Sequence, residues 1–233
     1  MRPRRSGWFF VGTSGTLLAA LLVAFSPTFF LRGFFDVLPI PTYLYVHGTL
    51  LTAWFVLVFV QTCLVAAHRT DVHRRLGILG AIIAILVVVH ASVVNIRAVP
   101  RLPADEPTVV ASVVIWNFLA LILFSMMVAA AVYFRGRPET HKRLMLLACF
   151  SLIGPVVGRL GMHLFGLPPG VAVEFERPAV MLLLVVLLTH DLTSTGSVHP
   201  ATRWGSLVLI VILVLSWTMA RTSVGLAFID ALR

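Results

Sequence analysis

Long apolar runs constrain this chain more than any other feature of its sequence. They cover about residues 7–31, 42–67, 76–96, 108–134, 144–165, 171–190 and 205–223. Each run is close to the roughly 20 residues that a helix needs to cross the hydrocarbon core of a bilayer. Backbone groups in lipid must satisfy their own hydrogen bonds, so the runs predict helices. We therefore expect an all-α integral membrane protein, a seven-helix transmembrane bundle.

The connections between the runs are too short to hold a soluble domain, so residues 1–233 are predicted to form a single transmembrane domain. Composition agrees with this interpretation. Hydrophobic residues make up 59% of the chain, charged residues make up 12%, and the mean hydropathy is +1.00. Water-soluble domains of this size do not reach such values.

Basic residues predict the orientation, because they are enriched in the cytoplasmic loops of membrane proteins. With the N-terminus inside, the cytoplasmic set is Arg2, Arg4, Arg5, Arg69, Arg74, Arg75, Arg135, Arg137, Lys142, Arg143 and Arg203. The outer set is smaller: Arg32, Arg97, Arg101, Arg177, Arg221 and Arg233. We expect a multi-pass protein of the cell membrane with a cytoplasmic N-terminus. The lipid bilayer is its expected partner, and the net charge of +9 needs no nucleic acid to explain it.

One cytoplasmic motif occurs twice. RTDVHRRL (69–76) and RPETHKRL (137–144) share the order Arg, any residue, acid, any residue, His, base, Arg, Leu. Each copy precedes an apolar run, so the pattern predicts an internally repeated helical hairpin. Helix capping and anchoring in lipid headgroups explain the motif, and they also explain His73 and His141 without a ligand role. Both histidines nevertheless stay secondary candidates.

Three histidines lie inside apolar runs at a common depth. His47 is six residues after Pro41, His90 is seven before Arg97, and His163 is five before Pro168. At 1.5 Å per residue, each is roughly 8 to 10 Å below the outer surface. A single intramembrane histidine is often structural, whereas a shared depth on three helices favours a common site.

A stripe of larger polar residues extends from His47 along the same helix. His47, Trp54, Gln61 and His68 recur every seven residues and so share one face. That face is predicted to point into the bundle. Ordinary packing of Trp54 and an interhelical hydrogen bond from Gln61 are the alternatives for these two secondary candidates.

The stretch GPVVGRLGMHLFG (154–166) places a charge inside an apolar run. Gly154 and Gly158 form a GxxxG pair that admits a neighbouring helix, and Pro155 removes a backbone hydrogen bond. Arg159 shares the side of Pro155 and His163. An intramembrane arginine needs a partner, for which we consider a bound anion, Glu174 or Glu176. The alternative is that Arg159 extends to the lipid headgroups.

Neutral imidazoles together with an arginine indicate the class of ligand. Haem b fits the residue types, because two histidines bind its iron and an arginine neutralises a propionate. A single copper or zinc ion held by His47, His90 and His163 fits them as well. We therefore predict cofactor binding by these three histidines and Arg159.

The segment 45–77 carries a family resemblance through His47, Gly48, Gln61, His73, Arg74 and Gly77. It resembles a hairpin of uncharacterised bacterial multi-pass membrane proteins, in which His-Gly, Gln and an HRxxG turn occur in this order. HKRLM and HPATRWG are similar to the same group. More loosely, the arrangement resembles transmembrane b-type cytochromes, which implies paired histidine ligands for haem.

Three functions stay open. The first is electron transfer or haem handling, with a redox partner. The second is a metal-dependent membrane hydrolase, and the third is a structural or assembly factor without a cofactor. The sequence leaves open whether the protein is an enzyme.

Overall fold

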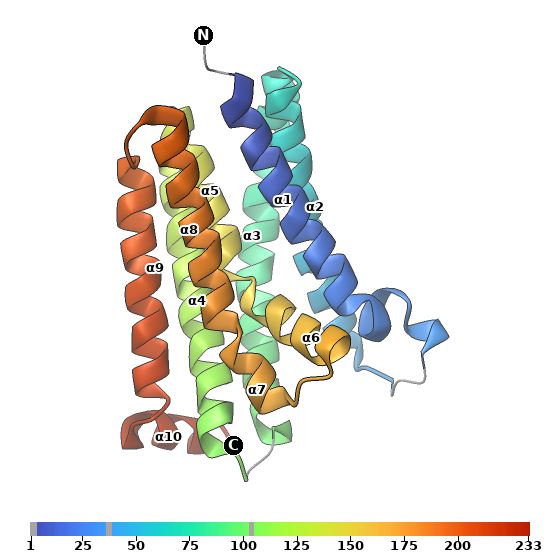
Figure 1. Cartoon of the computed structure of the whole chain (residues 1–233). Coiled ribbons are helices and arrows are strands. Elements are labelled where there is room, and N and C mark those ends of the chain that lie inside the picture. The colour runs from blue at the N-terminus through green and yellow to red at the C-terminus, as the bar shows by residue number, and fades with distance from the viewer. Residues whose placement is uncertain (1–3, 36–38, 103–104) are drawn as a thin grey trace.

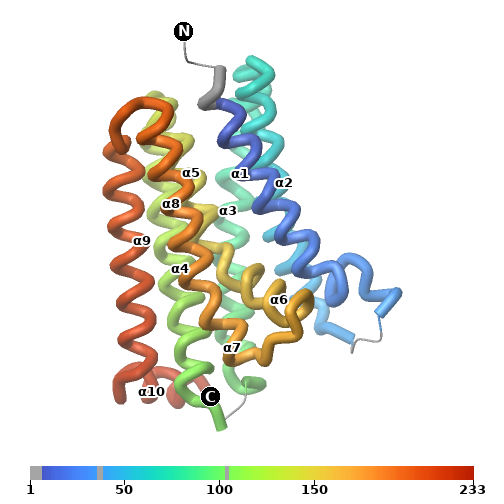
Figure 2. Tube along the Cα trace, in the orientation of Figure 1, coloured from blue at the N-terminus to red at the C-terminus, as the bar shows by residue number. Residues whose placement is uncertain are grey.

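The computed structural model describes residues 4–35, 39–102 and 105–233, and within them it contains helices and no strands. Arg2 lies outside these residues. The first helix, α1 (Arg4–Phe25), continues as a π-helix, η1 (Ser26–Phe30), and a 3-10 turn, η2 (Arg32–Phe34). Figure 2 shows this continuation projecting sideways from the bundle. The predicted run 7–31 is therefore α-helical only as far as Phe25.

Two hairpins come next along the chain. The first is α2 (Thr42–Ala66) and α3 (Thr70–Ala98), which ends in the 3-10 turn η3 (Val99–Arg101). The second is α4 (Pro107–Tyr133) and α5 (Pro138–Ser151). The two helices of each hairpin pack side by side, and both connections lie at the same end of the bundle (Figure 1). Pro107 and Pro138 stand in the first turn, where the missing N–H costs no intrahelical bond.

The rest of the chain folds back along these hairpins. It contains α6 (Gly154–Phe165), α7 (Pro169–Glu174), α8 (Glu176–Thr195), α9 (Pro200–Met219) and α10 (Ser223–Asp230). In Figure 1, α8 and α9 run alongside α4 and α5, whereas α10 crosses the far end. We call the end where α3, α5 and α9 begin the inner end, after the predicted orientation, and the opposite end the outer end.

Two predicted helices have different bounds in the structure. The run 144–165 is broken into α5 and α6, whose axes differ by 48°. Pro155 is the reason, because it has no N–H for the helix to continue and instead begins a new one. The run 171–190 becomes α7 and the longer α8, which ends where Gly196 adopts a positive φ of 77°.

Among the described residues, five helices are long and apolar enough to cross a membrane: Gly7–Phe30, Thr42–Ala66, Thr70–Arg101, Pro107–Tyr133 and Pro200–Met219. The bent pair α5 and α6 is a sixth if it counts as one span. The protein is thus an all-helical chain of membrane-spanning character. The count of seven crossings stays a prediction.

The exposed face of α3 is suited to a lipid environment. Ile78, Ile82, Ile85 and Val89 are between 50% and 70% exposed, and their spacing places them on one face. Contiguous apolar surface of this kind is rare on soluble monomers. By contrast, half of the most apolar stretch of α4 is buried inside the protein, whereas only 17% of the corresponding stretch of α3 is buried. Helix α4 is therefore the central helix of the bundle.

Candidate functional site

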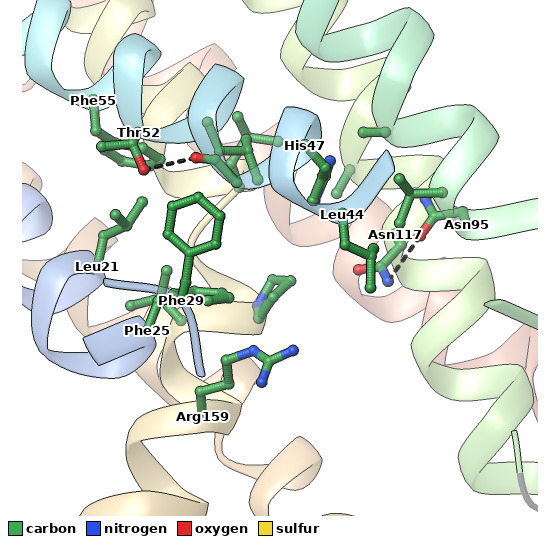
Figure 3. Close-up of a pocket in the computed structure, with 18 of the residues that line it drawn as sticks. Leu21, Phe25, Phe29, Leu44, His47, Thr52, Phe55, Asn95, Asn117 and Arg159 are labelled. Carbon is green, nitrogen blue, oxygen red and sulfur yellow. Dashed lines mark hydrogen bonds between the residues drawn. The ribbon is translucent and has the colours of Figure 1, made fainter. Parts of the chain in front are cut away.

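A cavity of about 250 Å³ lies between α1, α2, α3, α4 and α6, towards the outer end of the bundle. Most of its lining is apolar and includes Phe25, Phe29, Phe30 and Phe55. Figure 3 labels Phe25, Phe29 and Phe55. The polar side chains that line it are His47, Thr52, Asn95, Asn117, Ser151 and Arg159. No carboxylate stands among the described residues around it. The cavity is therefore apolar in character, with one fixed cation.

Arg159 reaches this cavity because the chain breaks after α5. The new helix α6 turns away by 48°, and its guanidinium lies 4.7 Å from the centre of the Phe25 ring. Figure 3 shows Arg159 on α6 and His47 on α2 at opposite sides of the cavity. Within the described residues, no Asp or Glu oxygen lies within 4.0 Å of its nitrogens. The cation contacts an aromatic face and has no acidic partner there.

Neither of the two glutamates considered as partners forms an ion pair with Arg159. Glu174 pairs with Arg177 at 2.9 Å and lies 3.7 Å from Arg221. Glu176 is only 8% exposed and lies against the glycines of α6. Of the three partners weighed for Arg159, a bound anion is therefore the one that these contacts leave open.

The glycine pair of α6 admits a side chain. A Cβ atom on Gly154 would lie 2.7 Å from Glu176 Oε2, and one on Gly158 would lie 2.9 Å from Glu176 Oε1. Trp116 Nε1 would be 2.6 Å from the same position on Gly154. A neighbouring helix, α8, thus packs against the pair as expected, and the atoms that come closest belong to the carboxylate of Glu176 on α8 and the indole of Trp116 on α4.

Two of the three predicted histidines come together. The ring centres of His47 on α2 and His90 on α3 are 6.1 Å apart, with 23° between the ring planes. His47 lines the cavity, whereas His90 is not among the lining residues. His90 Nδ1 is buried and has no hydrogen-bond partner in the described part of the chain. The pair thus offers ring nitrogens next to the cavity that holds Arg159.

His163 does not join this pair. It is exposed and is not among the residues that line the cavity. Depth along the chain places it level with His47 and His90, but the 48° bend changes the direction of α6. A common depth fixes the height of a residue and not the side of the helix on which it lies.

Asn95 and Asn117 line the cavity although sequence reasoning did not single them out. Asn117 Nδ2 donates to Asn95 Oδ1 at 3.3 Å, which joins α3 to α4 (Figure 3). Hydrogen bonds between amides are a common link between membrane helices. The signal was available, because each asparagine interrupts a long apolar run near its outer end.

The secondary candidates lie outside the cavity. Trp54 is 1% exposed and packs edge-on against Phe124 at 4.9 Å between ring centres, as ordinary core packing does. Gln61 Nε2 donates to the backbone oxygen of His73 at 3.2 Å. His73 and His141 form a second histidine pair at the inner end, with ring centres 6.2 Å apart.

No protein-family model, curated protein or solved structure matches this chain. In the described residues, no group of three His, Cys, Asp or Glu side chains is placed to hold a metal ion. The resemblances drawn from the sequence therefore stay predictions. The chemistry of the site rests on the cavity itself.

Proposed function

We propose that this protein binds an anionic amphiphile in the cavity between α2 and α6, inside the membrane and near its outer face. The observation that carries this proposal is the position of Arg159. Its guanidinium lines an apolar cavity, and the described acidic side chains are not paired with it. A cation held in apolar surroundings is costly unless an anion compensates it, so the ligand supplies the acidic group.

The rest of the lining suits the other parts of such a ligand. His47 and the Asn95–Asn117 pair provide polar contacts, whereas Phe25, Phe29 and Phe55 provide apolar surface. A few polar groups in an apolar wall are typical of small-molecule sites. A ligand with an acidic head and an apolar body therefore matches both halves of the lining.

Access from the bilayer supports a ligand that resides in lipid. A shallower hollow on the surface of α2 and η1 shares Phe29, Phe30 and Thr52 with the cavity. Its other lining residues include Val56, which is 40% exposed. The ligand reaches Arg159 sideways, past the Phe29 and Phe30 rings.

Two kinds of ligand combine an acidic group with an apolar body in this way: haem b, and a lipid or fatty acid. The donor types fit haem, because the two ring centres are 6.1 Å apart and an arginine lies nearby. The space does not fit it, because about 250 Å³ is below the roughly 300 to 1,000 Å³ typical of sites for drug-sized ligands. A porphyrin requires the lining to move apart. Electron transfer or haem handling, with a redox partner, is proposed only if the ligand is haem b.

The proposal includes the finer topology predicted from the sequence. The chain crosses the cell membrane seven times, with α5 and α6 together and α7 and α8 together each making one crossing. The N-terminus is cytoplasmic. Arg159 and His47 then lie in the outer half of the bilayer, within reach of lipids of the outer leaflet.

The test uses the full chain in lipid nanodiscs, with a fluorescent fatty acid and haemin as separate probes. Hydrogen bonds to charged groups contribute about 1.5 to 3 kcal/mol. We therefore expect Arg159→Leu to weaken fatty acid binding by about 10- to 100-fold. The control is Arg221→Met, which removes an outer arginine whose guanidinium lies over Trp217 at 4.1 Å.

The haem arm has its own readout. Haem held by these imidazoles gives an absorption spectrum that His47→Ala and His90→Ala change, whereas the fluorescent fatty acid has no iron for the imidazoles to bind. Equal binding of both probes by Arg159→Leu and Arg221→Met would overturn the proposal. Loss of haemin binding alone in the two histidine variants would identify haem as the ligand.

A further inference from the structure

A second pair of histidines lies at the inner end of the bundle, far from the cavity. The ring centres of His73 on α3 and His141 on α5 are 6.2 Å apart, with 85° between the ring planes. His73 and His90 both belong to α3 and are 17 residues apart, which at 1.5 Å per residue is about 25 Å. The two pairs therefore form separate sites.

The inner pair results from the repeated motif. His73 and His141 occupy the same position in RTDVHRRL and RPETHKRL, each in the first turn of its helix or just after it. Both helices begin at the inner end, so the two copies bring equivalent imidazoles together. The motif thus does more than anchor two helices in the headgroups.

A hydrogen bond sets the protonation of His141. Its Nδ1 lies 2.8 Å from the backbone oxygen of Ala131. A carbonyl oxygen only accepts, so Nδ1 carries the proton and donates. In the neutral ring, Nε2 then has a free lone pair. Metal-binding histidines are usually oriented in this way, with the second nitrogen donating to a carbonyl or carboxylate.

One nitrogen of this pair and one neighbouring oxygen lack partners. His73 Nδ1 and Gln61 Oε1 are buried, and neither has a hydrogen-bond partner in the described residues. The Gln61 amide is fixed at the site, because its Nε2 donates to the His73 backbone oxygen at 3.2 Å. Buried polar atoms left without a partner are costly, and each is a potential donor to a bound ion.

The spacing suits one ion between the rings. A ring nitrogen is about 1 Å from its ring centre, and a metal is about 2.0 to 2.1 Å from the nitrogen. Two imidazoles on one ion therefore have centres about 5 to 6 Å apart, the larger value when the rings lie nearly opposite each other. The observed separation is 6.2 Å.

We propose that His73 and His141, with the Gln61 side-chain oxygen as a third donor, bind one transition-metal ion of the copper or zinc class. Imidazole is a preferred ligand of both metals. Because α3 and α5 belong to different hairpins, the ion joins the two hairpins at the inner end. The proposal does not rest on ligand binding in the outer cavity.

The experiment measures metal binding by the full chain in nanodiscs after chelator treatment. Zn²⁺ and Cu⁺ are titrated separately, the latter under reducing conditions. Wild-type protein is expected to bind one equivalent that is lost, or weakened by more than about 100-fold, in both His73→Ala and His141→Ala. The ion should also raise the unfolding temperature of the wild type and not that of the two variants.

Two controls separate this site from others. His68→Asn removes an exposed histidine of the same end, and asparagine tolerates the positive φ of 59° at that position. His47→Ala removes the outer pair and is expected to retain the inner equivalent. Wild-type protein that binds neither ion saturably would overturn the proposal, whatever the variants do. Equal loss in His68→Asn would do so too.

Discussion

Arg143 and Asp191 form an ion pair that is sealed inside the inner end of the bundle. Arg143 Nη2 lies 2.6 Å from Asp191 Oδ1, and the two side chains are 1% and 0% exposed. Asp191 also accepts hydrogen bonds from Thr202 Oγ1 at 2.6 Å and from the His199 backbone N–H at 3.1 Å. The pair therefore ties α5, α8 and the start of α9 together.

Removing one partner of this pair should strongly destabilise the protein. Arg143→Met leaves the Asp191 carboxylate buried without its cation, and Asp191→Asn leaves the guanidinium with the more exposed Glu139 as its remaining anion. Breaking a buried pair in this way costs about 3 to 5 kcal/mol, whereas replacing both partners by apolar groups costs less. Chemical unfolding in detergent should therefore rank the double variant Arg143→Met with Asp191→Leu above either single variant. A single variant as stable as wild type would contradict this account.

Alanine at Gly158 should displace Glu176. The added Cβ would lie 2.9 Å from Glu176 Oε1, a distance that requires the carboxylate to move. We expect Gly158→Ala to destabilise the protein by about 1 to 3 kcal/mol, as overpacking does. Unfolding of the double variant Gly158→Ala with Glu176→Ala measures the coupling. Effects that simply add would show that the two residues do not interact.

Labelling of single cysteines should place the two ends of the bundle. Arg137, between α4 and α5, and Arg101, at the end of η3, are both exposed at opposite ends. In a background with Cys63 and Cys149 replaced by serine, an impermeant thiol reagent should label Arg101→Cys in intact cells. Arg137→Cys should react only after permeabilisation. The reverse pattern would invert the orientation.

Acid should weaken the start of α9. His199 Nδ1 accepts a hydrogen bond from the Ala201 N–H at 3.1 Å, which only the unprotonated nitrogen can do. Burial, and then the charge of Arg143, lower the pKa of His199 below its usual value of 6.5. This contribution to stability is full above the unfolded pKa and is lost as pH falls through the folded one.

The measurement is unfolding free energy against pH. Wild type should lose stability below about pH 6.5 relative to His199→Asn, because asparagine caps a helix without titrating. Parallel curves for the two proteins would exclude His199 as a source of the pH dependence.

Sequence reasoning reaches those parts of the site that depend on distance along a helix. Counting residues places His47 and His90 at one depth, and the structure brings their rings to 6.1 Å. Arg159 is recognisable as a charge within an apolar run, and it lines a cavity. Helical rise is constant, so depth can be counted from the nearest helix end.

The remaining parts depend on rotation about helix axes and on partners far along the chain. Residue counting misplaces His163, because Pro155 starts a new helix whose direction the sequence does not specify. Asp191 is 48 residues from Arg143, and nothing local indicates that one neutralises the other. The GxxxG spacing likewise predicts that a helix approaches α6, but it does not indicate that the buried carboxylate of Glu176 is the group that meets the two glycines.

Because Ser26–Phe30 is a π-helix, the position of the aromatic side chains in the cavity depends on the number of residues in this segment. A π-helical turn closes hydrogen bonds between residues five apart, so it holds one residue more than an α-helical turn would. Deleting Thr28 would let α1 continue as a regular helix and rotate the residues beyond the deletion by about 100°. The Phe29 ring packs closely on Gly48, since a Cβ atom on this glycine would lie 2.6 Å from the ring. After the deletion, the ring would no longer face Gly48. A one-residue deletion outside α2 would thus open a gap beside Gly48 without changing any residue of α2.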